Sequence, residues 1–387
     1  MFMSAAAAHQ QKPVTDPVRV MVVDDSVVAR GLMARWIDED PALAVVGTLR
    51  TGKLAVEQIA KLEPDVVVLD IEMPEMDGLT ALPLLLKARP GVQVVMASTL
   101  TRRNAEISLK ALSLGAADYV PKPESNSGVS TSPEFKRDLV AKVIALGSRG
   151  QTSARSPHIA RADAPAKVVS KVAPSLVNKA TVSAGDMRRW SSSVPRILAV
   201  GSSTGGPQAL TKFFETVGPT ATRVPIVVTQ HMPATFTAIL AENLGKAAGL
   251  PAAEGRDGEV LKPGHIYVAP GGKHMIIKPE AGGAKIALTD GPPVNFCKPA
   301  VDPLFDSLAE VFGPAVLAAV LTGMGNDGGK GAVRISDAGG SVVAQDEATS
   351  VVWGMPQAVV QNKACCAVLP LDLLSGKIAK MLKGERP

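Results

Sequence analysis

Five polar side chains stand where β-branched runs end in the first third of the sequence. They are Asp24, Asp25, Asp70, Ser98 and Lys122. Parallel strands bring their carboxyl ends to one edge of a sheet, so we expect these side chains to share a crevice. Three carboxylates crowded together repel one another unless a cation neutralises them, which favours a site for a hard divalent ion such as Mg²⁺.

Asp70 is the natural nucleophile of this group, because a carboxylate that attacks a phosphoryl group forms an aspartyl-phosphate. Lys122 and Ser98 would then hold the remaining phosphoryl oxygens. Each residue also has a purely structural interpretation: an aspartate can cap the next helix, Ser98 can be a turn residue, and Lys122 can be a surface charge. Their joint occurrence at strand ends favours the phosphate-accepting site.

A second group begins at Gly201, where GSSTGG follows the apolar run RILAV and precedes an amphipathic segment. This G-x-S-x-G arrangement between strand and helix is typical of a nucleophile elbow, and its register selects Ser203 over Ser202. The N-terminus of the helix favours a developing oxyanion. A glycine-rich phosphate cradle is the alternative, but the segment lacks the lysine of a P-loop and the spacing of a dinucleotide fingerprint.

A nucleophilic serine needs a base, and the region from residue 194 onward offers three histidines. His231 follows the run PIVVTQ, which places it at the same edge as Ser203. His265 precedes its run and is expected at the opposite edge, while His274 falls in an expected turn. We therefore expect His231 to be the base.

An orienting acid is expected at that same edge. Asp327 fits, because it lies in LTGMGNDGG after the run AVLAAV, and the glycines allow close backbone approach. Asp302 and Asp306 lie in a helical pattern and are interpreted as capping or surface residues, and Asp290 as a turn carboxylate. The order serine, histidine, aspartate along the chain differs from that of α/β-hydrolases, so we expect the triad on another fold.

Two series of apolar runs, separated by helical periodicity, must position these groups. The first comprises residues 19–23, 43–48, 65–70, 92–98 and 117–121. The second comprises residues 196–201, 224–231, 265–270, 315–323 and 340–345. Runs that are apolar on both faces and alternate with helices predict parallel sheets covered on both sides. The expected fold class is α/β, with two doubly wound domains: a (βα)5 domain and a larger one built on a mostly parallel sheet.

Two segments depart from this simple alternation. Pro83 falls inside the helical segment after Gly78, so we expect that helix to start late or irregularly. Residues 273–279 and 284–290 are expected to form an antiparallel pair added to the second sheet.

Charge marks the boundary between the two domains. The chain has 387 residues and a net charge of +5, and residues 149–193 alone contribute +6 from eight basic and two acidic side chains. This segment is rich in Ala, Ser and Pro and lacks sustained periodicity, which predicts a flexible linker. We expect a disordered N-terminus (1–17), a first domain (18–148), this linker (149–193) and a catalytic domain (194–387).

Composition excludes several classes of protein. The basic charge is confined to one segment and aromatic residues make up 3%, which argues against nucleic acid as a partner. Cys297, Cys365 and Cys366 form neither a disulfide framework nor a metal-binding pattern, which suits a reducing cytosol. The N-terminus lacks signal-peptide features and no stretch approaches 18 apolar residues, so we expect a cytoplasmic protein.

The first series of motifs resembles the receiver domain of bacterial two-component response regulators. The motifs are DDS (24–26), VVVLDIEMPEMDGL (66–79), MAS (96–98) and GAADYVPKP (115–123). The resemblance implies that a chemotaxis histidine kinase phosphorylates Asp70. It implies four ligands for Mg²⁺: Asp24, Asp25, Asp70 and the backbone carbonyl of Glu72. It also implies switch roles for Ser98 and Tyr119, phosphate contact by Lys122, and a cis bond between Lys122 and Pro123.

The second series resembles the chemotaxis-specific protein-glutamate methylesterases of the CheB family. Its motifs, GSSTGGPQAL, QHMP and LTGMGNDGG, stand behind a receiver. The resemblance implies five site residues: Ser203 as nucleophile, His231 as general base and acid, Asp327 as orienter, and Thr204 and Met324 as oxyanion donors through their backbone amides. Ala300 stands where a serine is common in the family, which bears on a contact near the substrate groove rather than on the chemistry.

The combined resemblance implies an enzyme that removes methyl esters from glutamates of methyl-accepting chemotaxis receptors, releases methanol, and deamidates receptor glutamines. No cofactor is implied for the ester reaction. We expect the unphosphorylated receiver to cover the edge that carries Ser203, and phosphorylation of Asp70 to loosen it. Two alternatives stay open: a response regulator with a non-enzymatic output, such as a DNA-binding module or a silent scaffold, and an esterase with a different protein target. A further hypothesis is that the basic linker touches an anionic surface such as the membrane that carries receptor arrays.

Overall fold

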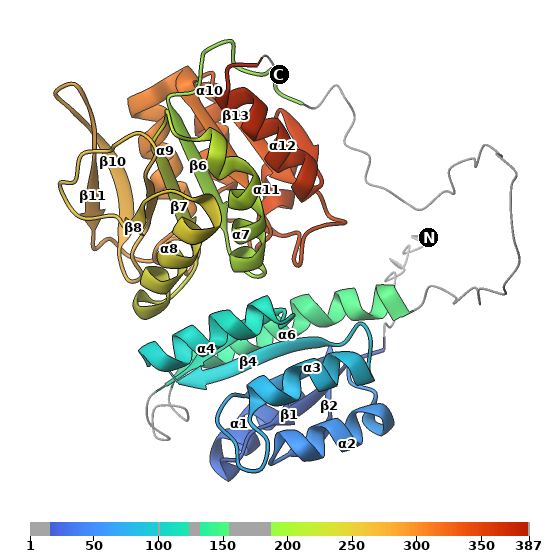
Figure 1. The fold of residues 1–387 in the computed structure, drawn as a ribbon. Helices are drawn as coiled ribbons and strands as arrows, with labels where there is room; N and C mark the ends of the chain where they lie inside the picture. Colours follow the sequence, from blue (N-terminus) through green and yellow to red (C-terminus); the bar gives the residue numbers. More distant parts are fainter. Residues whose placement is uncertain (1–15, 100, 124–131, 155–186, 386–387) are drawn as a thin grey trace, which may run out of the picture.

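A computed structural model describes residues 16–99, 101–123, 132–154 and 187–385. Residues 1–15 of the expected disordered N-terminus and residues 155–186 of the expected linker lie outside the described residues. The described chain forms two α/β domains, the first ending with helix α6 and the second beginning near Met187 (Figure 1).

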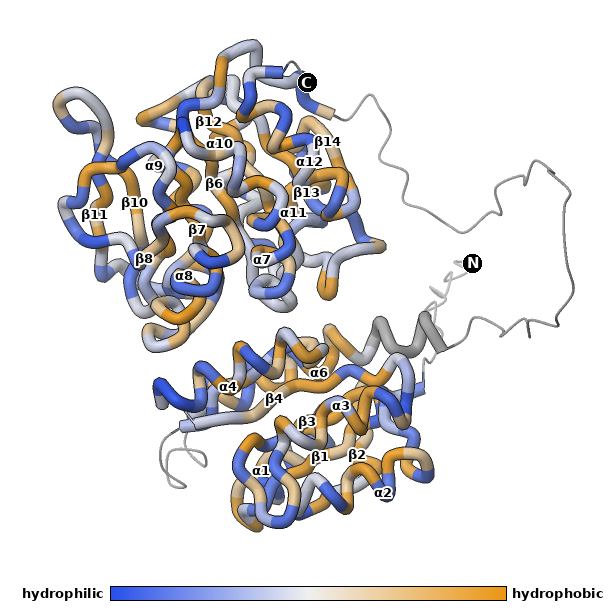
Figure 2. Tube along the Cα trace, viewed as in Figure 1, coloured by the Kyte–Doolittle hydropathy of each residue, from blue (hydrophilic) through white to orange (hydrophobic). Residues whose placement is uncertain are grey.

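The first domain is a five-stranded sheet with the order β2-β1-β3-β4-β5. Its strands are β1 (Val18–Val23), β2 (Leu43–Leu49), β3 (Val66–Asp70), β4 (Gln93–Thr99) and β5 (Asp118–Lys122). All four pairings are parallel, which confirms the expected (βα)5 arrangement. The helices are α1 (Val27–Asp38), α2 (Gly52–Leu62), α3 (Gly78–Ala88), α4 (Arg102–Ser113) and α6 (Pro133–Ala154). In Figure 2, β4 is hydrophobic over most of its length, as a strand covered on both faces must be.

Helix α3 corrects the expectation of a late or irregular start. It begins at Gly78, because the Asp77 side chain accepts a hydrogen bond from the N–H of Thr80 (2.7 Å) and caps the first turn. Pro83 lies inside the helix, and its ring is exposed to solvent. A strong cap and an outward-facing ring let the helix tolerate the missing N–H donor.

The second domain is built on a seven-stranded sheet with the order β14-β13-β12-β6-β7-β9-β8. Its strands are β6 (Ile197–Ser202), β7 (Ile226–Gln230), β8 (Ala252–Glu254), β9 (Ile266–Val268), β12 (Val316–Val320), β13 (Ser341–Gln345) and β14 (Ala367–Leu369). Every pairing is parallel. The three-residue edge strands β8 and β14 were not anticipated, because such short segments carry little periodicity.

Helices cover both faces of this sheet (Figure 1). They are α7 (Gly206–Val217), α8 (Ala234–Ala248), α9 (Val301–Phe312), α10 (Gly329–Asp337), α11 (Met355–Gln361) and α12 (Leu371–Leu382), with short 3₁₀ turns at Gly218–Thr220 and Gly313–Ala315. Strands β6 and β12, at the centre of the sheet, are fully buried. The two central strands therefore provide a rigid base for the loops at their carboxyl ends.

An antiparallel hairpin of β10 (His274–Glu280) and β11 (Gly283–Thr289) forms as expected. It is a separate two-stranded sheet rather than an addition to the main sheet, which is a correction. The hairpin packs instead on α9, where the hydroxyl of Ser307 accepts a hydrogen bond from the N–H of Ile277 (2.9 Å). It thereby supports the loop between β11 and α9.

Both ends of the segment expected to be a flexible linker (149–193) belong to the neighbouring domains, which is a correction. Helix α6 continues to Ala154, six residues beyond the expected boundary at 148. At the other end, the N–H of Ser191 donates to the hydroxyl of Ser341 (2.9 Å), and Arg188 pairs with Asp337 (2.9 Å). Residues 187–193 are therefore attached to the second domain.

Within the described ranges, no helix is both long and apolar enough to span a membrane.

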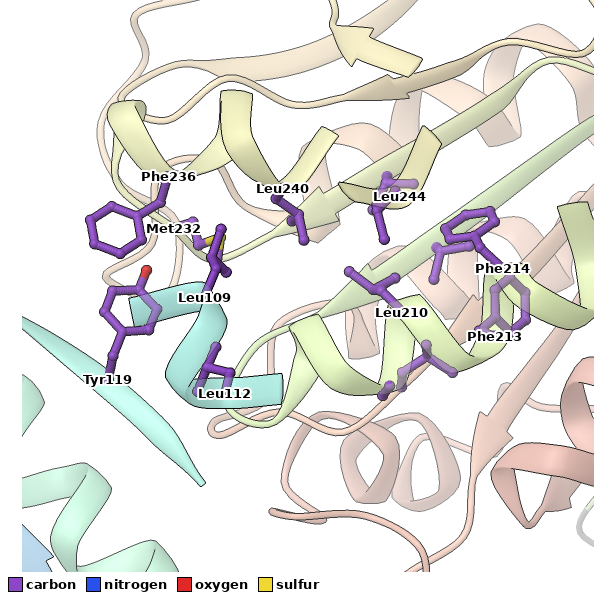
Figure 3. Packing of buried hydrophobic residues seen from close by; sticks show 14 of the residues in the cluster. Leu109, Leu112, Tyr119, Leu210, Phe213, Phe214, Met232, Phe236, Leu240 and Leu244 are labelled. Atoms are coloured by element: carbon purple, nitrogen blue, oxygen red, sulfur yellow. The ribbon is translucent and has the colours of Figure 1, made fainter. Parts of the chain in front are cut away.

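The two domains share a hydrophobic contact. Helix α4 of the first domain packs against α7 and α8 of the second, and buried residues of both belong to one continuous cluster. Figure 3 shows Leu109 of α4 next to Met232 of the second domain, and the Tyr119 ring next to that of Phe236. The latter two rings stack with centroids 4.4 Å apart and planes 8° apart.

Candidate functional site

The carboxyl edge of the first sheet brings three aspartates together. Asp24 and Asp70 are buried and Asp25 is exposed, and one carboxylate oxygen of each lies within 4.8 Å of the others. Lys122 reaches both buried carboxylates, with its Nζ 2.6 Å from Asp70 Oδ1 and 3.1 Å from Asp24 Oδ2. The lysine is therefore a member of this cluster and not a surface charge.

Burial raises the pKa of Asp70 to about 6, against the opposing effect of the nearby Lys122 ammonium. A cavity of about 240 Å³ opens beside this carboxylate and is also lined by Asp25, Glu72 and Ser98. Its donors are hard oxygens, the set that Mg²⁺ prefers. The residues present thus fit the expected Mg²⁺ site, because one exposed carboxylate and a small polar cavity remain beside the lysine-bound pair.

The two expected switch residues lie in different surroundings. The Ser98 hydroxyl is buried and lies 2.9 Å from that of Ser108, away from any turn role. Tyr119 is 3% exposed and its ring is covered by Phe236 of the second domain. The cis bond expected between Lys122 and Pro123 is not observed; in the described residues the cis peptide bond is Lys298–Pro299.

At the carboxyl edge of the second sheet, Ser203 lies in a turn between β6 and α7. Its N–H donates to the carbonyl of Thr322 (3.0 Å), and its carbonyl accepts from the N–H of Gly206 (2.7 Å). Gly205 has φ +73°, and a Cβ atom on Gly323 would lie 2.9 Å from the Cβ of Ser203. The loops after β6 and β12 can therefore approach this closely only because they carry glycines.

His231 and Asp327 meet at this edge, although they lie 96 residues apart. His231 Nε2 is 2.7 Å from Asp327 Oδ2. The Asp327 carboxylate also accepts hydrogen bonds from the N–H groups of Val301 (2.6 Å) and Asp302 (3.0 Å) at the start of α9. It is buried, so these donors hold it in one orientation.

The electrostatics of the pair are mutually reinforcing. Burial alone would lower the pKa of His231, but hydrogen bonds to Asp327 and Cys297 outweigh it and raise that pKa above its usual value. Burial alone would raise the pKa of Asp327, but the hydrogen bond and charge of His231 lower it. Both shifts favour an ionised aspartate that stabilises a protonated imidazole, which is what an acid–base pair in acyl transfer requires.

Cys297 is a neighbour of the candidate base that sequence reasoning did not identify. Its Sγ lies 3.3 Å from His231 Nδ1, the ring nitrogen that Asp327 leaves unused. Because Asp327 engages Nε2, Nδ1 is the ring nitrogen left to accept a proton from Ser203, the expected nucleophile. Cys297 lies against that same nitrogen. No spacing rule signals this contact, because Cys297 comes from the separate loop before α9.

Gln230 is a second residue that sequence reasoning left without a role. Its Oε1 accepts from the Ser202 hydroxyl (2.7 Å), and its Nε2 donates to the carbonyl of Ser203 (2.9 Å). The side chain thus ties the turn that carries Ser203 to the end of β7, directly before His231. Its position in the quoted motif QHMP was the available signal.

Three sequence interpretations are corrected here. Asp302 is buried, where its carboxylate accepts from the N–H of Gly331 (2.8 Å) and the side chain of Asn295 (3.2 Å), and burial raises its pKa to about 6. Asp306 is half-buried rather than a surface residue. His274 begins strand β10 and is buried, instead of lying in a turn, because its ring bonds both ends of the adjacent loop.

The expected oxyanion donors flank the nucleophile. Thr204 follows it in the turn, and Thr204's carbonyl accepts from the Thr322 hydroxyl (2.9 Å). Met324 lies in the loop after β12 and lines the same cavity as Ser203 and His231. In the described part of the chain, neither backbone N–H of these two residues has a protein acceptor. The two amides are therefore free to meet an oxyanion.

A cavity of about 990 Å³ contains this site and is lined from both domains. Ser203, His231 and Met324 line it from the second domain, while Tyr119 and Arg137 line it from the first. The candidate active site thus opens into the space between the domains, where the first domain lies across its mouth.

Comparisons with known proteins agree with this architecture. Residues 20–131 match the response regulator receiver domain, and residues 198–378 match the CheB methylesterase model. The fold and these matches define a class: a response regulator whose second domain is a hydrolase.

Curated relatives extend the match to nearly the whole chain. A protein-glutamate methylesterase/protein-glutamine glutaminase of a group 2 operon from Rhodopseudomonas palustris is 53% identical over 377 residues, covering 96% of each chain. A protein-glutamate methylesterase/protein-glutamine glutaminase from Nitrobacter hamburgensis is also 53% identical, covering 96% of this chain and 95% of its own. This chain therefore belongs to the CheB family of protein-glutamate methylesterases that carry a receiver domain.

Among solved structures, the Thermotoga maritima CheB methylesterase catalytic domain is 40% identical. That match covers 48% of this chain and 98% of that chain, with a TM-score of 0.47.

Proposed function

We propose that this enzyme hydrolyses γ-glutamyl methyl esters on methyl-accepting chemotaxis receptors in the cytoplasm, and that it converts receptor glutamines to glutamate. Ser203 Oγ attacks the carbonyl carbon while His231 Nδ1 accepts its proton. The C–O bond to the methoxy group then breaks, and the protonated imidazole returns the proton so that methanol leaves. Water, activated by the same ring, hydrolyses the acyl-enzyme and regenerates Ser203.

Each supporting residue has a role that its contacts explain. Asp327 holds the ring through Nε2 and stabilises its positive charge while Nδ1 carries the proton. The amides of Thr204 and Met324 are assigned to the oxyanion that forms in both steps. For glutamine the same attack expels ammonia in place of methanol, which needs the same base and the same oxyanion donors.

The first domain supplies regulation in this proposal. Asp70 accepts a phosphoryl group from a chemotaxis histidine kinase, with Asp24, Asp25 and the carbonyl of Glu72 as further Mg²⁺ ligands. The metal would neutralise charge on the transferring phosphoryl group. Lys122, now paired with Asp70, would turn to a phosphoryl oxygen, and Ser98 would contact another.

Tyr119 is the residue through which phosphorylation would reach the second domain. Its ring is stacked on Phe236, so a change in its position changes the interface directly. Two further polar contacts join the domains. Gln208 Nε2 donates to the carbonyl of Ala116 (2.8 Å), and Arg102 Nη2 forms an ion pair with Glu242 Oε1 (3.7 Å). We assign to this docked state the role of inhibition, because a receptor helix and the first domain cannot occupy the cavity mouth together.

The single observation that carries this proposal is the position of His231. Its ring is bonded to the buried Asp327 and lies in one cavity with Ser203. The test is methanol release from methylated receptors by the full chain. Ser203→Ala should lower the rate by about 10⁴-fold or more. Ser202→Ala is the matched control, since that hydroxyl is buried against Gln230 and should cost far less. Equal rates for wild type and Ser203→Ala would overturn the enzymatic role.

Residues 155–186, the part of the expected linker outside the described residues, are proposed as the connection that lets the first domain leave and return. Any peripheral contact with membranes is proposed to occur at the receptor arrays. The basic charge of the expected linker would favour the anionic inner leaflet. Neutralising its Lys and Arg residues should then reduce recruitment to receptor arrays without changing the rate on a receptor fragment free of membrane.

A further inference from the structure

The loop between β11 and α9 carries an unusual turn at the mouth of the cavity. The N–H of Val294 donates to the carbonyl of Cys297 (3.1 Å) and the N–H of Cys297 donates back (2.9 Å). The two residues between them, Asn295 and Phe296, have φ angles of +51° and +63°. Two successive left-handed residues define a type I′ turn, which favours asparagine first and glycine second. Phenylalanine at the second position is strained.

Buried polar groups hold this turn in place. The His274 ring accepts from the N–H of Ala300 (3.2 Å) through Nδ1, so Nε2 carries the proton and donates to the carbonyl of Pro292 (3.0 Å). These two bonds clamp both ends of the loop. Within it, Asn295 Nδ2 donates to Asp327 Oδ1 (3.2 Å). The turn cannot relax without disturbing the acid of the candidate triad.

The Phe296 side chain makes few packing contacts that could offset this strain. It is 77% exposed, even though the first domain is docked and the ring lines the same cavity as Ser203. The first domain contributes one cation–π contact, with Arg137 Cζ 4.7 Å from the ring centroid. A strained backbone that presents an exposed aromatic ring beside a reactive serine indicates a binding role, because strain persists where function needs it.

The nature of the occupant follows from the reaction. The ester is at the end of a glutamate side chain, so a glutamate that reaches Ser203 brings its own polypeptide segment to the mouth of the cavity. Phe296 lines this cavity together with Met232 and Pro233. Met232 is 4% exposed, so Phe296 and Pro233 supply most of the apolar surface there. A segment that presents apolar side chains next to its glutamate complements this surface.

We propose that Phe296 anchors the substrate polypeptide by packing against an apolar side chain next to the methylated glutamate. Arg137 contacts the same ring in the docked state, so a bound segment and the first domain would compete for part of this anchor. The proposal rests on the proposed function, in which a glutamate side chain of a protein reaches Ser203.

The test compares two substrates with the full-length enzyme in its phosphorylated state. One is a methylated receptor fragment, and the other is N-acetyl-glutamate γ-methyl ester, which has no polypeptide flanks. Phe296→Ala should raise KM for the receptor fragment about tenfold with kcat within about twofold, and leave kcat/KM for the small ester unchanged. Phe296→Tyr should retain the wild-type KM, because it keeps the ring.

Leu373→Ala is the matched control, since Leu373 is 63% exposed on α12 and does not line the cavity. It should leave both substrates unaffected. Equal losses on both substrates for Phe296→Ala would show that the residue only supports the triad and would overturn the proposal, as would an unchanged KM for the receptor fragment. Failure of the wild-type enzyme to release methanol from the receptor fragment would instead refute the proposed function.

A second variant separates strain from binding. Phe296→Gly relieves the positive φ, so Tm should rise while KM for the receptor fragment rises as in Phe296→Ala. A Tm below that of the wild type would contradict the argument that the ring is kept against the preference of the turn.

Discussion

The carboxyl edges of the two parallel sheets hold sites in different states of readiness. At the first, Lys122 already bonds the carboxylate of Asp70, and the partners of the expected reaction are in contact. At the second, His231 is bonded to Asp327 and faces Cys297, while the cavity mouth is covered by the other domain. In the proposed function, the first site needs only its reagents, whereas the second also needs the first domain to move away.

This difference shows how one sheet architecture serves two purposes. Both sites use the edge where parallel strands end, yet one gathers three aspartates near the Lys122 ammonium and the other brings together the expected acid, base and nucleophile. The readiness of the first site fits a domain that must respond to a signal. The covered state of the second fits an enzyme that must stay inactive until that response.

The largest effect expected from this comparison is that one variant loses methanol release alone and another loses phosphate incorporation alone. Asp327→Asn should lower the rate of methanol release by about 10³- to 10⁴-fold, because the carboxylate that stabilises protonated His231 loses its charge. The same variant should incorporate phosphate at the wild-type rate. Asp70→Asn should show the reverse, with no phosphate incorporated and an unchanged basal rate of methanol release.

Both rates can be measured on the same full-length preparations, by phosphate incorporation from acetyl phosphate with Mg²⁺ and by methanol release. Loss of both activities in either variant would mean that the two sites are not independent at rest.

A smaller effect is expected where Gln230 joins two strands of the second sheet. Gln230→Leu leaves the buried Ser202 hydroxyl and the Ser203 carbonyl without their partner, at a cost of about 2–4 kcal/mol in the free energy of unfolding. The turn that positions the nucleophile should loosen, so kcat should fall about tenfold. Denaturant titration and kinetics measure the two quantities.

Gln357→Leu is the control for Gln230→Leu, because Gln357 is an exposed glutamine on α11. It should alter neither quantity. Wild-type kcat in Gln230→Leu would show that the link between the strands has no part in placing Ser203.

The smallest expected effect is a shift in the pH profile when Cys297 no longer contacts His231 Nδ1, the ring nitrogen that accepts the Ser203 proton in the proposed mechanism. The hydrogen bond to Cys297 raises the pKa of His231, so its loss in Cys297→Ala should lower that pKa. A base works in its neutral form, and the rising limb of the kcat/KM pH profile should therefore move to lower pH. The buried Cys365, which does not line the cavity, supplies the control variant Cys365→Ala.

An unmoved limb in Cys297→Ala would mean that the cysteine does not influence the base. A limb moved to higher pH would mean that the thiol donates to Nδ1 and holds the ring neutral, which would reverse the sign of its effect.

The sequence predicted what periodicity and strand ends can encode. The parallel sheets follow from alternating runs, and the positions of Asp70, Ser203, His231 and Asp327 follow from the rule that parallel strands end at one edge. The capped start of α3 was predicted wrongly, because the proline was weighed without the strong cap at Asp77.

Apart from Gln230 at the end of β7, the unpredicted part of the site comes from one loop. Asn295, Phe296 and Cys297 lie on an irregular segment before α9, whose path is set by His274 and by buried carboxylates rather than by periodicity. Asp302 was misassigned for the same reason, since its burial depends on that loop and on Gly331. Contacts between loops distant in sequence are not encoded in local spacing.

The central claim is that the docked first domain holds the esterase inactive until Asp70 is phosphorylated. The most direct test measures methanol release from methylated receptors by the full-length enzyme with and without acetyl phosphate and Mg²⁺, in the wild type and in Asp70→Asn. We predict a rise of about tenfold or more in the wild type and none in Asp70→Asn. A wild-type rate that is the same in both conditions, with phosphate bound at Asp70, would contradict the claim.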